Sequence, residues 1–219
     1  MSGVDLPQFI QILAVAVVPV LFAITVHEVA HGWMALQFGD RTAEMLGRLT
    51  LNPVKHVDPV GTVLFPMMTL FFGGFLFGWA KPVPINPRAL RNPKRDMIAV
   101  AAAGPGANLL MAFGWALLYH LSNFAISGPD SPAFFFLTMA KIGCNFNILL
   151  MLFNLLPIPP LDGSRVLRGF VPESIGRVLD TLERYGLIIV VGLIVLGLIT
   201  PVVVVMRIVV RFLGVPALF

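Results

Sequence analysis

Long apolar segments are the feature that most constrains how this chain can fold. A helix that crosses the hydrocarbon core of a bilayer needs about 20 mostly apolar residues. Four segments meet that requirement, namely 9–34, 97–121, 134–156 and 187–206. Because the interior of a bilayer offers no water to backbone polar groups, each segment is expected to be helical. The sequence therefore predicts an all-α polytopic membrane protein, built as a bundle of transmembrane helices.

The composition supports a membrane protein and excludes several other classes. The chain is 58% hydrophobic and 12% charged, with a mean hydropathy of +0.90, whereas soluble domains are about 45–50% apolar and about 25% charged. Its first segment lacks a basic start and a cleavage site, so we do not expect a signal peptide. The net charge of +4 comes from loop Lys and Arg, which favours no nucleic-acid partner. We expect one membrane domain over 1–219, with a core at about 9–170 and a C-terminal span at about 185–213.

Two shorter segments suggest local departures from a simple bundle. Segment 60–79 is apolar but is interrupted by Gly73, Gly74 and Gly78, and we expect it to enter the membrane and return on the same side. Residues 42–51, around Gly47, predict a short β element made of a strand pair. Pro201 is expected to kink or split the last apolar segment.

The charges of the loops predict an orientation. Loop 81–95 holds five Lys and Arg residues and loop 157–184 holds four, whereas 122–132 holds none. Because cytoplasmic loops carry an excess of Lys and Arg, the two basic loops are expected in the cytoplasm and the uncharged loop outside.

The first apolar segment ends in a metal-binding pattern, His27-Glu28-Val29-Ala30-His31. Side chains four apart share one helix face, so the two histidines can present imidazoles to one metal ion, as in HExxH metalloproteases. Glu28, about 100° round the helix, can take a proton from a water that the metal activates. By composition such a pattern arises by chance in roughly one chain of this length in a hundred. Ionisable side chains at membrane depth are also expected to be functional.

A catalytic zinc ion needs a third protein ligand. The single cysteine, Cys144, excludes both a disulfide and a cysteine-rich zinc site. His120 lies near the uncharged loop and is expected at the interface between membrane and water. His56 is expected to be a solvated loop residue. Asp162 is the better candidate for the third ligand. It follows a run of prolines and precedes Gly163, which permits a tight turn. Capping of the next helix is the alternative role for Asp162.

The chain resembles the site-2 protease family of intramembrane zinc metalloproteases, peptidase family M50. The resemblance rests on the HExxH pattern and on Asn154-x-x-Pro157-x-Pro159-x-Leu161-Asp162-Gly163. Between the two, residues 103–108 resemble the Gly-Pro-x-x-Asn segment of the middle core helix of the family. Gly104 and Gly106 by themselves indicate close helix packing. PDZ and CBS domains, which many relatives carry, have no counterpart here, so the chain resembles a minimal prokaryotic member.

The resemblance implies roles for individual residues. His27, His31 and Asp162 would bind one Zn²⁺ ion, and Glu28 would be catalytic. Asn154 would hold the substrate backbone or the developing oxyanion, with an interhelical hydrogen bond as an equally weighted alternative. Asn147, seven residues earlier on the same face, is expected to supply only packing or water contacts.

The function expected from these features is hydrolysis of a peptide bond in or near a transmembrane segment of another membrane protein. Such a zinc metalloendopeptidase would take part in regulated intramembrane proteolysis, in a prokaryotic cell membrane, with its active site towards the cytoplasm. A metal-ion or small-solute transporter is one alternative, although the chain lacks the paired repeats that transporters often show. The other alternative is an inactive scaffold that binds membrane helices, but such a protein would be expected to lose Glu28 or a ligand. The substrate, any regulator and the oligomeric state are not specified by the sequence.

Overall fold

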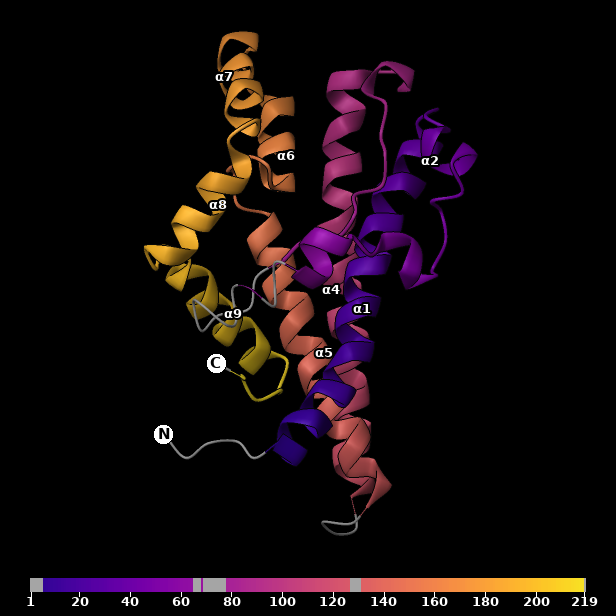
Figure 1. Ribbon diagram of the computed structural model, residues 1–219, viewed down its shortest axis with the longest axis vertical. Coiled ribbons are helices and arrows are strands. Elements are labelled where there is room, and N and C mark those ends of the chain that lie inside the picture. Colours follow the sequence, from indigo (N-terminus) through magenta and orange to yellow (C-terminus); the bar gives the residue numbers. More distant parts are fainter. Residues whose placement is uncertain (1–5, 65–67, 69–77, 127–130, 219) are drawn as a thin grey trace.

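The computed structural model describes residues 6–64, 68, 78–126 and 131–218, and Figure 1 shows their arrangement. Within these residues all regular structure is helical. The elements are α1 (Leu6–Gln37), α2 (Thr42–Met45), η1 (Pro53–His56), η2 (Pro59–Leu64), η3 (Pro87–Ala89), α4 (Pro93–Ala125), α5 (Pro132–Asn154), α6 (Asp162–Phe170), α7 (Glu173–Glu183), α8 (Gly186–Val195) and α9 (Thr200–Phe212).

Helices α1, α4 and α5 form the centre of the molecule and pack along one another (Figure 1). Each contains a stretch long and apolar enough to cross a membrane: Ala14–Gln37, Pro93–Ala125 and Pro132–Asn154. The buried positions between them are rich in small side chains, which let helix backbones approach closely. These positions include Ala23, Ala101, Gly104, Ala112, Ala116, Ala140, Gly143 and Cys144.

The predicted β element at 42–51 is wrong, because this segment begins with the short helix α2. The Asp40 carboxylate accepts hydrogen bonds from the backbone N–H and the hydroxyl of Thr42, and an Asp in this place favours the start of a helical turn. Gly47 ends the turn with a positive φ of 62°, which glycine adopts without strain. Within the described residues, the part of 42–51 that follows Gly47 forms no strand.

The expected re-entrant path of 60–79 lies mostly outside the described residues. Its two ends are described, and they lie side by side. Trp79 donates its backbone N–H to Gly61 O, and the Thr62 hydroxyl donates to Trp79 O. The Asp58 carboxylate starts the turn η2 by accepting from the N–H groups of Val60 and Gly61.

The last apolar segment is divided into α8 and α9, which meet at an angle of 76°. The break lies at Gly197, which has a φ of 70°. Pro201 follows in the first turn of α9, where a missing N–H costs no hydrogen bond. If the bent pair counts as one span, the described chain has up to four candidate spans.

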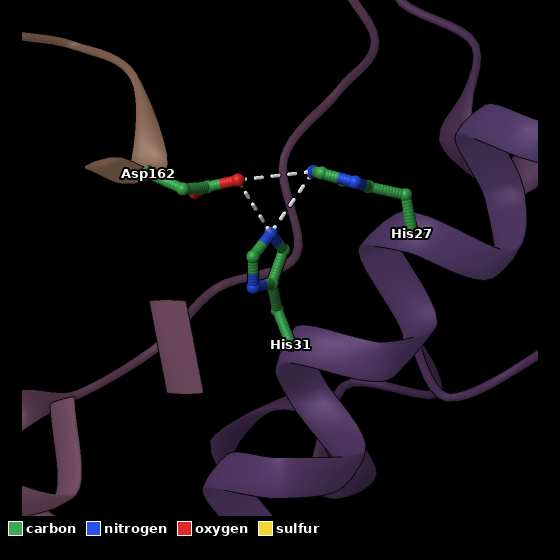
Figure 2. A group of neighbouring side chains, drawn as sticks. All are labelled: His27, His31 and Asp162. Atoms are coloured by element: carbon green, nitrogen blue, oxygen red, sulfur yellow. Dashed lines mark hydrogen bonds and ion pairs between the residues drawn. The ribbon is translucent and has the colours of Figure 1, made fainter. Parts of the chain in front are cut away.

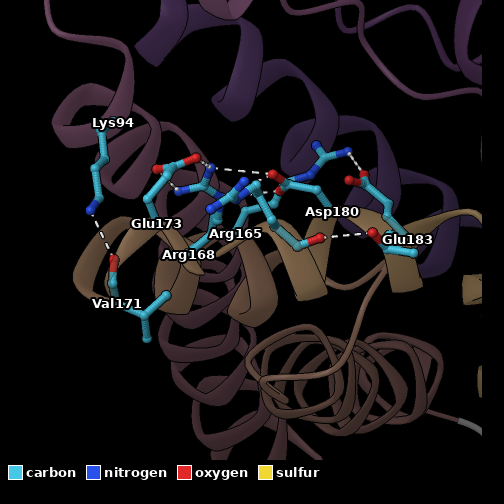
Figure 3. A network of polar contacts seen from close by, with 9 residues as sticks. Lys94, Arg165, Arg168, Val171, Glu173, Asp180 and Glu183 are labelled. Atoms are coloured by element: carbon cyan, nitrogen blue, oxygen red, sulfur yellow. Dashed lines mark hydrogen bonds and ion pairs between the residues drawn. The ribbon is translucent and has the colours of Figure 1, made fainter. Parts of the chain in front are cut away.

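Helices α6 and α7 form a charged hairpin beside the N-terminal part of α4 (Figures 1 and 3). Arg168 of α6 donates to both Glu173 and Asp180 of α7. Lys94 of α4 donates to the Val171 carbonyl in the turn between the two helices. This hairpin holds the first residue of α6, Asp162, against the central bundle.

Candidate metal centre

His27, His31 and Asp162 converge at one point between α1 and the start of α6 (Figure 2). The Nε2 atoms of the two histidines are 3.0 Å apart. The Oδ2 atom of Asp162 lies 3.2 Å from His27 Nε2 and 3.3 Å from His31 Nε2. All three residues are buried, with at most 8% of each exposed. The structure thus brings together the three residues predicted as ligands, although they are 135 positions apart at most (162 − 27).

The outer nitrogens of both imidazoles are held by oxygen acceptors. His31 Nδ1 lies 2.7 Å from the Val100 carbonyl oxygen, and His27 Nδ1 lies 2.6 Å from Asn108 Oδ1. Both acceptors require a proton on Nδ1. In a neutral imidazole the other nitrogen then carries a lone pair, so both Nε2 atoms direct lone pairs at Asp162.

This donor set fits a zinc ion. Zinc bonds of about 2.0–2.1 Å in a tetrahedral arrangement place two ligand atoms about 3.3 Å apart, close to the three separations observed. Among the described residues, Asp162 Oδ2 is buried without a hydrogen-bond partner of good geometry. A buried carboxylate requires positive charge nearby, and a divalent ion satisfies all three atoms together.

Gly104 of α4 makes room for the two imidazoles. A Cβ atom at this position would overlap His31 Nε2 and His27 Cε1. The sequence alone indicates helix packing at Gly104. Its neighbours in the structure are the imidazoles of the candidate metal centre, which a single sequence does not reveal.

Asp162 reaches the centre because α6 starts directly behind the end of α5. A Cβ atom on Gly163 would overlap the Leu155 carbonyl oxygen, so glycine permits this close approach. Leu161 occupies the capping position of α6, and Asp162 is the first helical residue. The side chain of Asp162 turns to the histidines, which rules out the alternative in which it caps the helix.

Glu28 lies next to the centre but outside the ligand group. Its side chain is half-buried, and its Oε2 accepts a hydrogen bond of 2.8 Å from the backbone N–H of Val83. Val83 belongs to the extended loop that precedes α4, and the sequence gives no sign of this contact. The placement is suited to a base that acts beside a metal without binding it.

The remaining candidates lie elsewhere. Asn154 is half-buried and donates its amide to the Leu150 carbonyl of its own helix. His56 is buried, with 2% exposed, and its Nε2 contacts the Thr50 carbonyl, so the expected solvated loop position is wrong. His120 is exposed and contacts the Leu213 carbonyl at the end of α9. Within the described residues, neither histidine belongs to the metal-ligand group.

A family model and the similar known proteins agree on one family for this chain. The family model described as peptidase family M50 matches residues 15–134 and 125–198. The "Putative zinc metalloprotease YwhC" of Bacillus subtilis is 40% identical over 179 residues, which cover 79% of this chain and 76% of that protein. The "Putative zinc metalloprotease Rip2" of Mycolicibacterium smegmatis is 33% identical over 176 residues, 80% of this chain and 64% of that protein. Rip2 of Mycobacterium tuberculosis is 26% identical over 168 residues, 77% and 61% of the two chains. No solved structure gives a significant match.

Proposed function

Because the chain belongs to peptidase family M50 and is a zinc metalloprotease, we propose that it cleaves membrane proteins within the bilayer or at its edge. The bond hydrolysed lies in or near a transmembrane segment of the substrate, as in regulated intramembrane proteolysis. The observation that carries this proposal is the burial of His27, His31 and Asp162 against helices long enough to cross a membrane.

The substrate class follows from this location. We propose that the peptide bond that reaches the centre belongs to a chain that enters the bilayer. The carbonyls of a transmembrane helix are hydrogen-bonded within the helix, so the substrate has to unwind before it can be cleaved. We therefore expect Gly, Pro or polar residues near the cleavage site. The partners of the protease are a single- or multi-span membrane protein and the lipid bilayer.

The residues of this chain divide the chemistry among them. His27, His31 and Asp162 would hold the zinc ion, which when bound makes a water nucleophilic near neutral pH. Glu28 accepts the proton that this water loses as its oxygen bonds to the substrate carbonyl carbon. Glu28 then delivers the proton to the amide nitrogen as the C–N bond breaks. The products are a carboxylate and an amine, so the atoms of one water are divided between them.

Asn154 is the remaining catalytic candidate. A side-chain amide can stabilise the negative charge that develops on the carbonyl oxygen. In the structure its amide nitrogen donates one hydrogen bond, of 3.0 Å, to the Leu150 carbonyl oxygen, and the second N–H of the same NH₂ group would serve the substrate.

The test separates metal binding from catalysis. Purified protein is reconstituted with a single-span substrate that carries Gly and Pro near the middle of its transmembrane helix. Glu28→Gln should keep about one zinc per chain while cleavage falls by roughly 10²–10⁴-fold, because only the base is lost. Asp162→Ala should lose zinc and cleavage together. Cleavage by Glu28→Gln at the parent rate, or full zinc affinity in Asp162→Ala, would contradict the proposed roles.

A further inference from the structure

A line of side-chain amides connects the candidate metal centre to helix α5. His27 Nδ1 lies 2.6 Å from Asn108 Oδ1. Asn108 Nδ2 donates to Asn147 Oδ1 at 2.9 Å, and Asn147 Nδ2 donates to the Gly143 carbonyl at 2.8 Å. The line crosses from α1 through α4 to α5. Asn108 and Asn147 are both fully buried, with 0% exposed.

Two carbonyl groups set the direction of the hydrogen bonds in this line: Gly143 in α5 accepts from Asn147, and Ala23 in α1 accepts a longer bond of 3.4 Å from Asn108 Nδ2. The Gly143 carbonyl can only accept, so Asn147 must turn its NH₂ group towards it and its oxygen towards Asn108. Asn108 must then present its NH₂ group to Asn147 and its oxygen to His27. That oxygen requires a proton on His27 Nδ1, which leaves the lone pair on Nε2 free for a metal.

We propose that Asn147 is a positioning residue for the zinc centre, and that it acts through Asn108 to hold His27 in its metal-binding tautomer. Without Asn147, only the longer hydrogen bond from Asn108 Nδ2 to the Ala23 carbonyl, at 3.4 Å, opposes a turn of the Asn108 amide that would present its NH₂ group to His27 Nδ1. The proton of His27 would then move to Nε2, where it blocks the metal. The inference rests on the proposed zinc site and adds a residue that touches neither metal nor substrate.

Burial of two amides is costly in an apolar bundle unless each polar group is paired. A small apolar side chain would pack there without that requirement. Outer partners of metal-binding histidines fix the tautomer and the ring orientation, and their loss typically weakens metal binding about 10–100-fold. Asn147 is one step further out, and its effect depends on the single hydrogen bond to Asn108.

The same helix offers a matched control in Asn145. This residue is also an asparagine with 0% exposed, but its amide binds Pro216 O and Leu218 N in the C-terminal tail. Asn145→Leu removes a buried amide of the same size without touching the line to His27. It therefore reports the cost of packing and of lost hydrogen bonds alone.

The first experiment measures zinc affinity by competition with a chelator, together with the thermal midpoint of each variant. Asn147→Leu should bind zinc roughly 10-fold or more weakly than the parent, and Asn145→Leu should bind it as the parent does. Equal affinity in Asn147→Leu and the parent, or an equal loss in both variants, would overturn the proposal. A parent protein that binds no zinc would instead overturn the proposed function itself.

A second experiment separates an effect of Asn147 on the His27 tautomer from an effect on packing. Asn108→Asp retains an oxygen for His27 Nδ1 and makes the tautomer independent of Asn147. It also loses the donor to Asn147 and Ala23, so the zinc affinity of Asn108→Asp itself is the reference for this comparison. In that background Asn147→Leu should no longer weaken zinc binding. A double-mutant cycle measures this coupling. An unchanged effect of Asn147→Leu in the Asn108→Asp background would show that Asn147 acts only on packing.

Discussion

At the scale of single residues, the two imidazoles leave no room for a side chain at the facing position of α4. Gly104 lies under both rings, and the position where its Cβ atom would lie is already within 3 Å of ring atoms. Gly106, about half a turn along the same helix, has nothing within 4 Å of its Cβ position. The two glycines of one motif therefore carry different constraints, which the motif alone does not distinguish.

Gly104→Ala should disrupt the zinc centre, while Gly106→Ala should not. The new methyl group forces the imidazoles or α4 to move, and overpacking of this kind typically costs about 1–3 kcal/mol. We expect at least a roughly 10-fold loss of zinc affinity for Gly104→Ala, measured by chelator competition. Gly106→Ala should bind zinc as the parent does, and it corrects for the higher helix propensity of alanine. Parent-like zinc binding in both variants would contradict the close contact at Gly104.

The candidate ligands could be picked out from the sequence because each belongs to a local pattern. His27 and His31 are four apart on a helix, and Asp162 follows prolines that end another helix. The supporting residues have no such pattern. The sequence indicates only packing for Asn147, because its partner, Asn108, is 39 positions away. The contact between Glu28 and Val83 joins residues 55 apart through a backbone N–H, which no side-chain pattern can indicate.

At the scale of elements, backbone hydrogen bonds hold the loop before α4 against η1, η2 and α1. Trp79, Lys81 and Val83 bind Gly61, His56 and Glu28 in turn through their backbone N–H groups. Asn86 N–H binds the buried carboxylate of Asp40. The side chain of Val83 also packs close to Gly32 of α1. The position of the Glu28 carboxylate therefore depends on a loop far from it in the sequence.

Val83→Pro should reduce kcat while zinc binding is retained, because proline removes the N–H that holds Glu28. We expect a fall of about 10-fold, the size of one lost hydrogen bond to a charged group. Val83→Ala keeps the N–H and loses only side-chain packing, so it serves as the matched control. Cleavage kinetics and zinc content of both variants decide the matter. Equal kcat values in the two variants would assign the loop a packing role only.

The elements themselves are predictable where hydrophobicity is continuous and less so where short polar signals compete. Expected spans 97–121 and 134–156 correspond to α4 and α5, whose bounds differ from the expected ones by a few residues. Segment 42–51 differs from the expected strand pair because the helix-starting carboxylate of Asp40 outweighs the pattern around Gly47. The bend after α8 falls at Gly197, since glycine adopts a positive φ, and not at Pro201.

At the scale of the whole molecule, helix lengths place the metal centre relative to the bilayer. Helix α4 has 33 residues, about 50 Å at 1.5 Å per residue, whereas the hydrocarbon core is about 30 Å thick. One end of α4 must therefore project. The charged α6–α7 hairpin packs beside its N-terminal end, through Lys94 and Gly169 (Figure 3), so that end is the projecting one. The centre contacts Val100, Gly104 and Asn108, near where α4 would leave the hydrocarbon.

This arrangement predicts that the hairpin and the metal centre face the cytoplasm, since the loops at that end carry the Lys and Arg residues. Two exposed polar residues at opposite ends allow a matched test, Ser174 at the start of α7 and Asn123 near the end of α4. In intact cells a membrane-impermeant maleimide should label Asn123→Cys and leave Ser174→Cys unlabelled. Opening the cells should make Ser174→Cys reactive as well. The parent is the control, because its single cysteine, Cys144, is fully buried. Labelling of Ser174→Cys but not Asn123→Cys in intact cells would reverse the orientation and place the protease centre on the outer side.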